Sequence, residues 1–145
     1  MAICNNEILK YNKRLMDYQR KNHSKFLIIY HIIFVVKYRK PLLMQCGDWM
    51  KCAMLKIAEK SDFAIKEIEL YRDHIHLMVE SVPKLSPLQI VRRLKQESTY
   101  CIWKEWPQLQ KFFWKEKTFW SDGYFCCSIG NASIDAVRKY IESQG

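Results

Sequence analysis

Alternation of hydrophobic and polar residues predicts two neighbouring β-strands near the middle of the chain. Residues 63–71 (FAIKEIELY) place Ile65 on the same face as the two glutamates. Residues 74–81 (HIHLMVES) follow after a tight connection, so the two segments predict a hairpin. The earlier segment 25–40 (KFLIIYHIIFVVKYRK) is apolar almost throughout and rich in β-branched and aromatic residues, which is typical of a central strand buried on both faces.

Three other segments have helical spacing. Residues 41–60 repeat apolar side chains along one helical face. A second helix is predicted to begin at Ser86, an N-cap residue type, with Pro87 in its first position. A third helix is predicted over residues 134–144, and short strands or extended segments are expected between the last two helices.

The element order is β-α-β-β-α-β, followed by the third helix. This order predicts the α+β class and a ferredoxin-like fold, in which an antiparallel sheet carries its helices on one face. We expect residues 1–24 to form an N-terminal arm and residues 25–145 to form one domain.

The chain is basic and rich in aromatic residues, with a formal net charge of +9 and 14% aromatic residues. This balance favours a nucleic-acid partner, because Lys and Arg neutralise phosphates, although a solvated basic surface is the alternative. The aromatic residues of segment 111–120 alternate with lysines, but we expect fewer than half of them to contact a ligand. The candidate DNA-binding residues close the first strand or lie on the second helix: Lys37, Arg39, Lys40, Arg92, Arg93 and Lys95.

The cysteine pattern and the N-terminal residues indicate the compartment. None of the six cysteines forms a CxxC pair, which argues against a structural zinc site. Residues 1–14 lack the apolar core of a signal peptide, so we expect reduced thiols and a cytoplasmic protein. The longest apolar run, residues 26–36, is too short to cross a bilayer, so no membrane role is expected.

His74 and His76 are the first candidates for chemistry. Side chains two residues apart on a strand point to the same face, so the two imidazoles would stand side by side while Ile75 enters the opposite layer. Neutral imidazole is a common metal ligand, and Asp73 or Glu80 could supply a third ligand or orient a ring. The alternative is a pair of strand histidines with ordinary hydrogen-bond partners.

The last predicted helix carries the second candidate. Tyr140 and Gln144 are four residues apart and therefore share a helical face. A tyrosine with a polar neighbour one turn away is a candidate nucleophile. A tyrosine at the margin of a packed helix is the alternative.

Four sequence segments together resemble a known family. The first strand ends in VVKYRKP, the hairpin carries RDHIHLMVE, and FWSDGYFCCSIG and IDAVRKYIESQ follow. This order resembles the single-tyrosine transposases of small bacterial insertion sequences (the insertion-sequence-200-like transposase family), members of the HUH (His-hydrophobic-His) nuclease superfamily. The resemblance covers about residues 26–144.

The resemblance implies a role for each candidate residue. His74, His76 and Gln144 would hold a divalent metal, Mg²⁺ or Mn²⁺, and Tyr140 would be the nucleophile. Tyr140 would attack a phosphodiester of single-stranded DNA, giving a 5′-phosphotyrosine and a free 3′-OH, and a 3′-OH would later rejoin the strands.

The resemblance also implies the partners. The enzyme would act as a homodimer whose sheets join, so that the tyrosine helix of one subunit serves the histidines of the other. Its basic face would bind DNA hairpins at the ends of the insertion sequence.

Two alternatives remain open from the sequence. A non-catalytic ferredoxin-like nucleic-acid-binding protein shares the element order, although the chain has no RNP-like run and only four glycines. A degenerate, inactive copy of a transposase, shortened at its C-terminal end, is the other.

Overall fold

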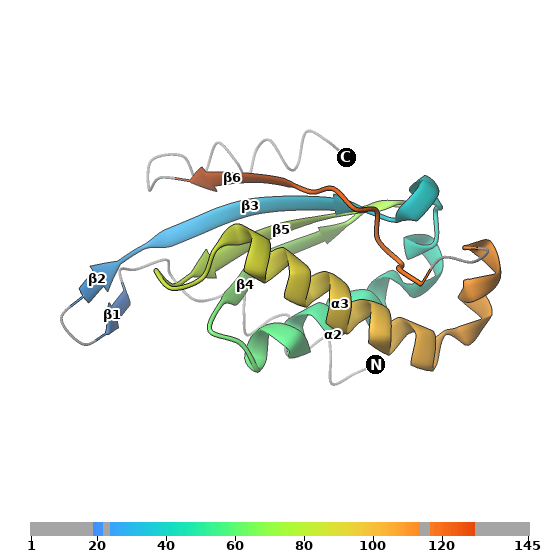
Figure 1. Cartoon of the computed structure of the whole chain (residues 1–145), viewed down its shortest axis with the longest axis horizontal. Coiled ribbons are helices and arrows are strands. Elements are labelled where there is room, and N and C mark those ends of the chain that lie inside the picture. The colour runs from blue at the N-terminus through green and yellow to red at the C-terminus, as the bar shows by residue number, and fades with distance from the viewer. Residues whose placement is uncertain (1–18, 22–23, 114–116, 130–145) are drawn as a thin grey trace.

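Strand β3 (Ile28–Val35) lies inside a four-stranded antiparallel sheet in the order β4-β5-β3-β6. The computed structural model describes residues 19–21, 24–113 and 117–129 of the chain. The other strands of the sheet are β4 (Ala64–Leu70), β5 (His74–Ser81) and β6 (Phe125–Ile129). A separate small hairpin pairs β1 (Gln19–Lys21) with β2 (Ser24–Phe26) at the start of β3 (Figure 1).

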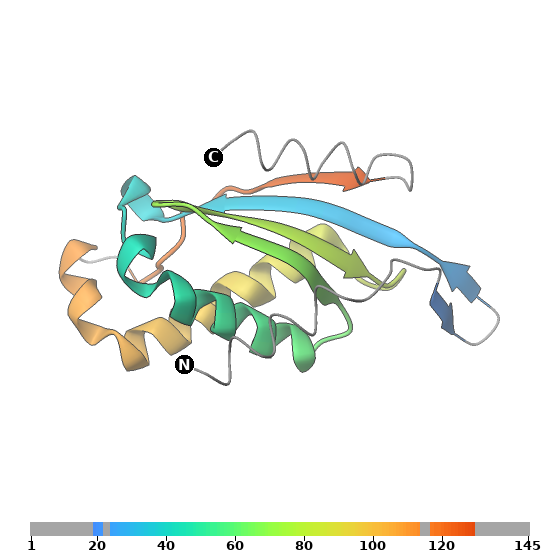
Figure 2. The same ribbon diagram turned by 180° about the vertical axis from the view of Figure 1, so that it is seen from behind.

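Both long helices cover the same face of the sheet. Helix α2 (Leu43–Glu59) follows β3, and helix α3 (Pro87–Glu105) follows β5. Figures 1 and 2 show the two helices side by side beneath the sheet, with β6 at its far edge next to β3. This arrangement confirms the predicted α+β class and ferredoxin-like element order.

Side chains alternate along the strands, so one face of the sheet forms the hydrophobic core and the other face carries the candidate site. Every second residue of β3 and β5 packs against the helices in one hydrophobic core, while the residues between them face the other way. The strand and helix residues at the centre of this core are Ile32, Phe34, Met50, Met54, Ile75, Leu77, Val79, Leu94 and Ile102.

The start of α3 confirms the sequence signal. The Ser86 hydroxyl accepts a hydrogen bond from the backbone N–H of Gln89, and the Gln89 side chain accepts one from the backbone N–H of Ser86. This reciprocal pair satisfies two amide groups at the helix terminus, and Pro87 fits the first position because it has no amide hydrogen. The predicted boundary is therefore correct.

Strand β4 departs from the predicted alternation. A β-bulge between Ile65 and Glu67 inserts an extra residue, so Ile65 pairs with Val79 and is buried in the core. The prediction that Ile65 shares a face with Glu67 is wrong for this reason. The displaced Lys66 instead reaches Glu80 on the face opposite the helices, with its Nζ 2.6 Å from the carboxylate.

The aromatic residues of segment 111–120 mostly serve the core. Helix η2 (Pro107–Phe112) begins this region, so its first residues form a 3₁₀-helix and not a strand. Phe113, Phe119 and Trp120 are buried, and Trp120 Nε1 donates to the Ser98 hydroxyl. Burial of these rings leaves Phe112 as the exposed aromatic residue among the described residues of segment 111–120.

Several predictions concern residues outside the described ranges. The helix over residues 134–144 and most of the arm, residues 1–24, fall there, so both remain predictions. Among the described cysteines, Cys46, Cys101, Cys126 and Cys127 are free. None of the described helices is long and apolar enough to cross a membrane.

Candidate functional site

His74 and His76 lie side by side on the face of β5 that points away from the helices. Their ring centroids are 5.0 Å apart. Ile75 between them and Leu77 after them are fully buried in the core. The strand pleat therefore presents both imidazoles together, as the sequence predicted.

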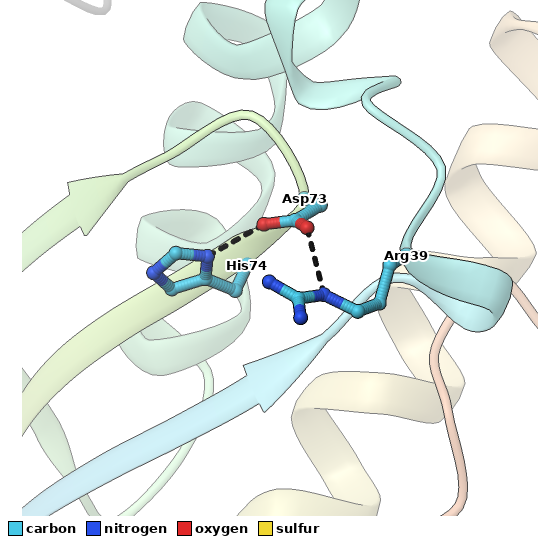
Figure 3. A network of polar contacts seen from close by, with 3 residues as sticks. All are labelled: Arg39, Asp73 and His74. Atoms are coloured by element: carbon cyan, nitrogen blue, oxygen red, sulfur yellow. Dashed lines mark hydrogen bonds and ion pairs between the residues drawn. The ribbon is translucent and has the colours of Figure 1, made fainter.

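A carboxylate and a guanidinium fix the orientation of the first histidine (Figure 3). His74 Nδ1 lies 2.7 Å from Asp73 Oδ1, and Arg39 Nε donates to Asp73 Oδ2 at 3.0 Å. Burial alone would raise the pKa of the Asp73 carboxyl, but the hydrogen bonds and charges of His74 and Arg39 lower it. With Nδ1 engaged by this anion, Nε2 of His74 is the nitrogen left to bind a metal.

An uncommon turn places Arg39 beside Asp73. Tyr38 and Arg39, in helix η1 (Lys37–Arg39), have positive φ angles of 60° and 51°. Non-glycine residues rarely adopt this conformation, and its cost must be offset by the surrounding contacts. One such contact is the hydrogen bond from the Val36 amide to the Asp73 carbonyl, 2.8 Å long, which ties the turn to the start of β5.

Tyr71 covers one side of the His74 ring. The two rings are stacked, with centroids 4.5 Å apart and an interplanar angle of 7°. The Tyr71 hydroxyl donates to Glu69 Oε2 at 3.0 Å, and burial, with Glu69 beside it, raises the pKa of Tyr71. Tyr71 is thus held at one end and fixes the plane of the imidazole at the other.

His76 is buried, and one of its ring nitrogens lacks a hydrogen-bond partner among the described residues. Its residue is 3% exposed, and its Nδ1 has no hydrogen-bond partner among the described residues. Burial, together with the neighbouring His74 and His31, lowers the pKa of His76 to about 4. The ring is therefore neutral near pH 7, which is the form that binds metals.

A third histidine, His31 on β3, lies next to the pair. Its ring centroid is 5.5 Å from that of His76, and burial lowers its pKa. Sequence analysis missed it because its place depends on the pairing of β3 with β5, which puts His31 opposite Met78. Its polar ring within an apolar strand was the only available signal.

Each of the two acidic candidates, Asp73 and Glu80, is engaged by other side chains. Asp73 is engaged by His74 and Arg39, while the buried Glu80 accepts from Lys66 and from Gln19. In the part of the chain that the structure describes, no group of three or more His, Cys, Asp or Glu side chains could hold a metal. Two imidazoles alone would therefore leave a bound metal ion in need of a ligand from elsewhere.

The six basic candidates fall into two separate groups. Lys37, Arg39 and Lys40 lie at the end of β3 beside Asp73, close to the histidines. The other three lie on α3, in the helix layer on the opposite side of the sheet (Figure 1). Of these, Arg93 bonds to Glu97 and to the Lys60 carbonyl, and Lys95 donates to three backbone carbonyls of residues 121–123.

Tyr140 and Gln144 lie outside the described residues, so their positions relative to the histidines remain predictions. The described part of the site still fits a divalent metal. It offers an oriented imidazole, a neutral buried imidazole with a nitrogen lacking a partner, and basic residues beside them.

Comparison with known proteins decides the family. The family model described as "Transposase IS200 like" matches residues 24–144, most of the chain. The chain belongs to the IS200-like transposase family. DNA transposition is the activity of this family. Membership also means that the chain is not an unrelated nucleic-acid-binding protein that happens to share the ferredoxin-like element order.

Two curated relatives of the IS200-like family show the extent of the similarity. The ISDra2 transposase TnpA of Deinococcus radiodurans is 29% identical over 116 residues, which cover 79% of this chain and 82% of the relative. The transposase for insertion sequence element IS200 of Salmonella typhimurium is 29% identical over 125 residues, covering 84% and 80%. Both alignments span most of each protein.

Solved structures share the fold of this IS200-like transposase. A Deinococcus radiodurans R1 protein described as a transposase superposes with a TM-score of 0.72, at 23% identity, covering 87% of this chain and 97% of its own. A REP-associated tyrosine transposase bound to a REP hairpin has a TM-score of 0.55, at 15% identity, covering 86% and 68%.

Proposed function

We propose that this IS200-like transposase cleaves and rejoins single-stranded DNA at the ends of an insertion sequence through a 5′-phosphotyrosine intermediate. The paired, oriented imidazoles of His74 and His76 on the open face of the sheet carry this proposal. Tyr140 is the proposed nucleophile and Gln144 the proposed third protein ligand, and the family match includes both positions.

Each transfer balances without an external energy source. The Tyr140 oxygen forms a bond to the phosphorus, the bond from phosphorus to the 3′ oxygen breaks, and that oxygen leaves as a 3′-OH. In the second step a 3′-OH attacks the phosphotyrosine, and the Tyr140 hydroxyl is restored. The phosphotyrosine conserves the energy of the original bond, so no nucleotide cofactor is required.

His74, His76 and Gln144 would hold a divalent ion, Mg²⁺ or Mn²⁺. The bound ion would neutralise charge on the scissile phosphate, which helps a phenol whose ordinary pKa is about 10. Asp73 orients His74 for this purpose, and Arg39 holds Asp73. A neutral His76 at pH 7 needs no deprotonation before it binds.

The proposed partners are DNA hairpins at the element ends and a second copy of this chain. Lys37, Arg39 and Lys40 lie on the histidine side and suit phosphates near the reacting bond, since Lys and Arg there neutralise backbone charge. In the proposed dimer the tyrosine of one subunit serves the histidines of the other. Residues 25–145 would form the transposase domain and residues 1–24 an arm.

The proposal is tested by mixing the full chain with a labelled single strand that carries the DNA flanking its own gene, plus Mg²⁺ or Mn²⁺. We expect a denaturing gel to show DNA joined to protein, and EDTA to abolish it. Tyr140→Phe should lose the joined band, while Tyr100→Phe, at an exposed tyrosine on α3, should keep it.

Two results would count against the proposal. Cleavage by Tyr140→Phe at the wild-type rate would exclude the tyrosine mechanism. Absence of any joined product from the folded wild-type protein with either metal would favour an inactive copy.

A further inference from the structure

A row of aromatic rings crosses the sheet from the β4–β5 turn to the β6 edge. Tyr71 stacks on His74, and successive ring centroids from His74 to His76, His31 and Phe125 are 5.0, 5.5 and 6.1 Å apart. The histidines occupy the middle of this row, and Phe125 occupies its outer end.

Strand register places Phe125 in line with the site. Ile33 on β3 is directly opposite His76 on one side and Phe125 on the other. Residues opposite one another in antiparallel strands share a face, so Phe125 lies on the same face as the imidazoles. Two strand spacings separate it from His76, about 10 Å, a distance that a short stretch of single-stranded DNA spans.

Phe125 is exposed although its neighbours in the row are not. Its exposed fraction is 52%, against 3% for His76 and 1% for His31. An exposed phenyl ring on a strand brings no core stability, yet this ring extends the row beyond the histidines of the proposed reaction site.

The chain leading into Phe125 is held firmly. Lys95 Nζ donates to the carbonyls of Ser121, Asp122 and Gly123, at 2.7, 3.3 and 2.7 Å. The Ser121 amide donates to the Val35 carbonyl at 2.8 Å. The ring is therefore presented by a fixed backbone and needs little ordering when a ligand binds.

We propose that Phe125 stacks on an unpaired base of the DNA strand close to the phosphate that reacts at His74 and His76. This inference rests on the proposed function, because it places the strand at the histidines. A nucleobase is the occupant that fits best: the chain carries a net charge of +9, and every base has a flat face for an aromatic ring. Phe125 is thus a positioning residue that sets which phosphate reaches the site.

The test is a double-mutant cycle between protein and DNA, run without metal so that binding alone is measured. The probe is the same single strand, made with an abasic site at each successive position in turn. We expect Phe125→Ala to weaken binding of the intact strand at least about fivefold, and Phe125→Trp to bind like wild type. One abasic position should cause the same loss in wild type and no additional loss in Phe125→Ala.

Tyr100→Ala is the matched control, because it removes an exposed ring from the helix layer. It should leave binding unchanged, and thermal unfolding should show that both variants fold. Wild-type affinity in Phe125→Ala, or a loss that no abasic position reproduces, would overturn the proposal. So would a loss of dimer on size-exclusion chromatography, which would assign the ring to a second copy.

The binding test of Phe125 and the gel test of the proposed function can fail independently of each other. Absence of a joined product in the gel assay with wild-type protein would remove the phosphotyrosine mechanism, whereas the binding cycle would still show whether Phe125 contacts a base.

Discussion

Tyr71 and His74 lie face to face, with ring centroids 4.5 Å apart and planes 7° from parallel. Such contacts contribute about 0.5–1.5 kcal/mol beyond the area they bury. Tyr71→Ala should therefore weaken Mn²⁺ binding about two- to tenfold, while Tyr71→Phe, which keeps the ring, should bind like wild type. Calorimetric titration with Mn²⁺ measures both, and equal affinities for the alanine variant and wild type would refute this role.

Asp73 should contribute more to metal affinity than Arg39 does. Partners that orient a ligating histidine typically change metal affinity about 10- to 100-fold, so Asp73→Ala should cause a loss of that size. Arg39→Ala should cost only a few-fold, because its side chain is 78% exposed and exposed ion pairs contribute about 0.2–1 kcal/mol. Titration with Mn²⁺ gives the order, and an equal or larger loss for Arg39→Ala would contradict the arrangement.

The buried His76 predicts acid sensitivity of the metal-free protein. Its pKa is lowered to about 4 in the folded state, against about 6.5 in an unfolded chain, so the unfolded chain takes up the proton first. The free energy of unfolding in EDTA should therefore fall as the pH drops from 6.5 towards 4. Urea titrations across this range measure the slope.

His76→Asn is the control for this slope. The variant should reduce the slope without abolishing it, because the lowered pKa of His31 acts in the same direction. An unchanged slope in His76→Asn would assign the acid sensitivity to other groups.

Lys95 should contribute to stability and little to DNA affinity. Its ammonium donates to three backbone carbonyls, so Lys95→Met leaves them without this donor and should lower the free energy of unfolding by about 1–3 kcal/mol. Arg92→Met, at an exposed position of the same helix, should change it by less than about 0.5 kcal/mol. Urea titrations measure the free energy of unfolding of both variants. Equal values would show that the Lys95 hydrogen bonds do not stabilise the fold.

The sequence predicts the strands and helices well where local rules apply. Alternation placed His74 and His76 together because the pleat of a strand fixes which side chains share a face. The Ser86 cap was correct because it depends on neighbours in sequence. Both features are local, and both were confirmed.

Features that depend on register or on local irregularity could not be read from the sequence. His31 and Phe125 join the histidine row only because β3 pairs with β5 and β6 in one particular alignment. Ile65 enters the core because of a bulge that no pattern marks, and Arg39 reaches Asp73 through a left-handed turn without glycine. Tyr140 and Gln144 remain predictions from the resemblance and the family match.

Because side chains alternate along β5, the same strand register that buries its apolar residues also places the two histidines on the opposite face. If β5 slipped by one residue against its neighbours, Ile75 and Leu77 would replace both imidazoles, and the two polar rings would enter the space now filled by those apolar side chains. Such a slip would unfold the domain. It would not produce a folded protein that merely lacks the two histidines at its site. A folded relative that lacks these histidines should therefore have lost them by substitution and not by a change of strand alignment.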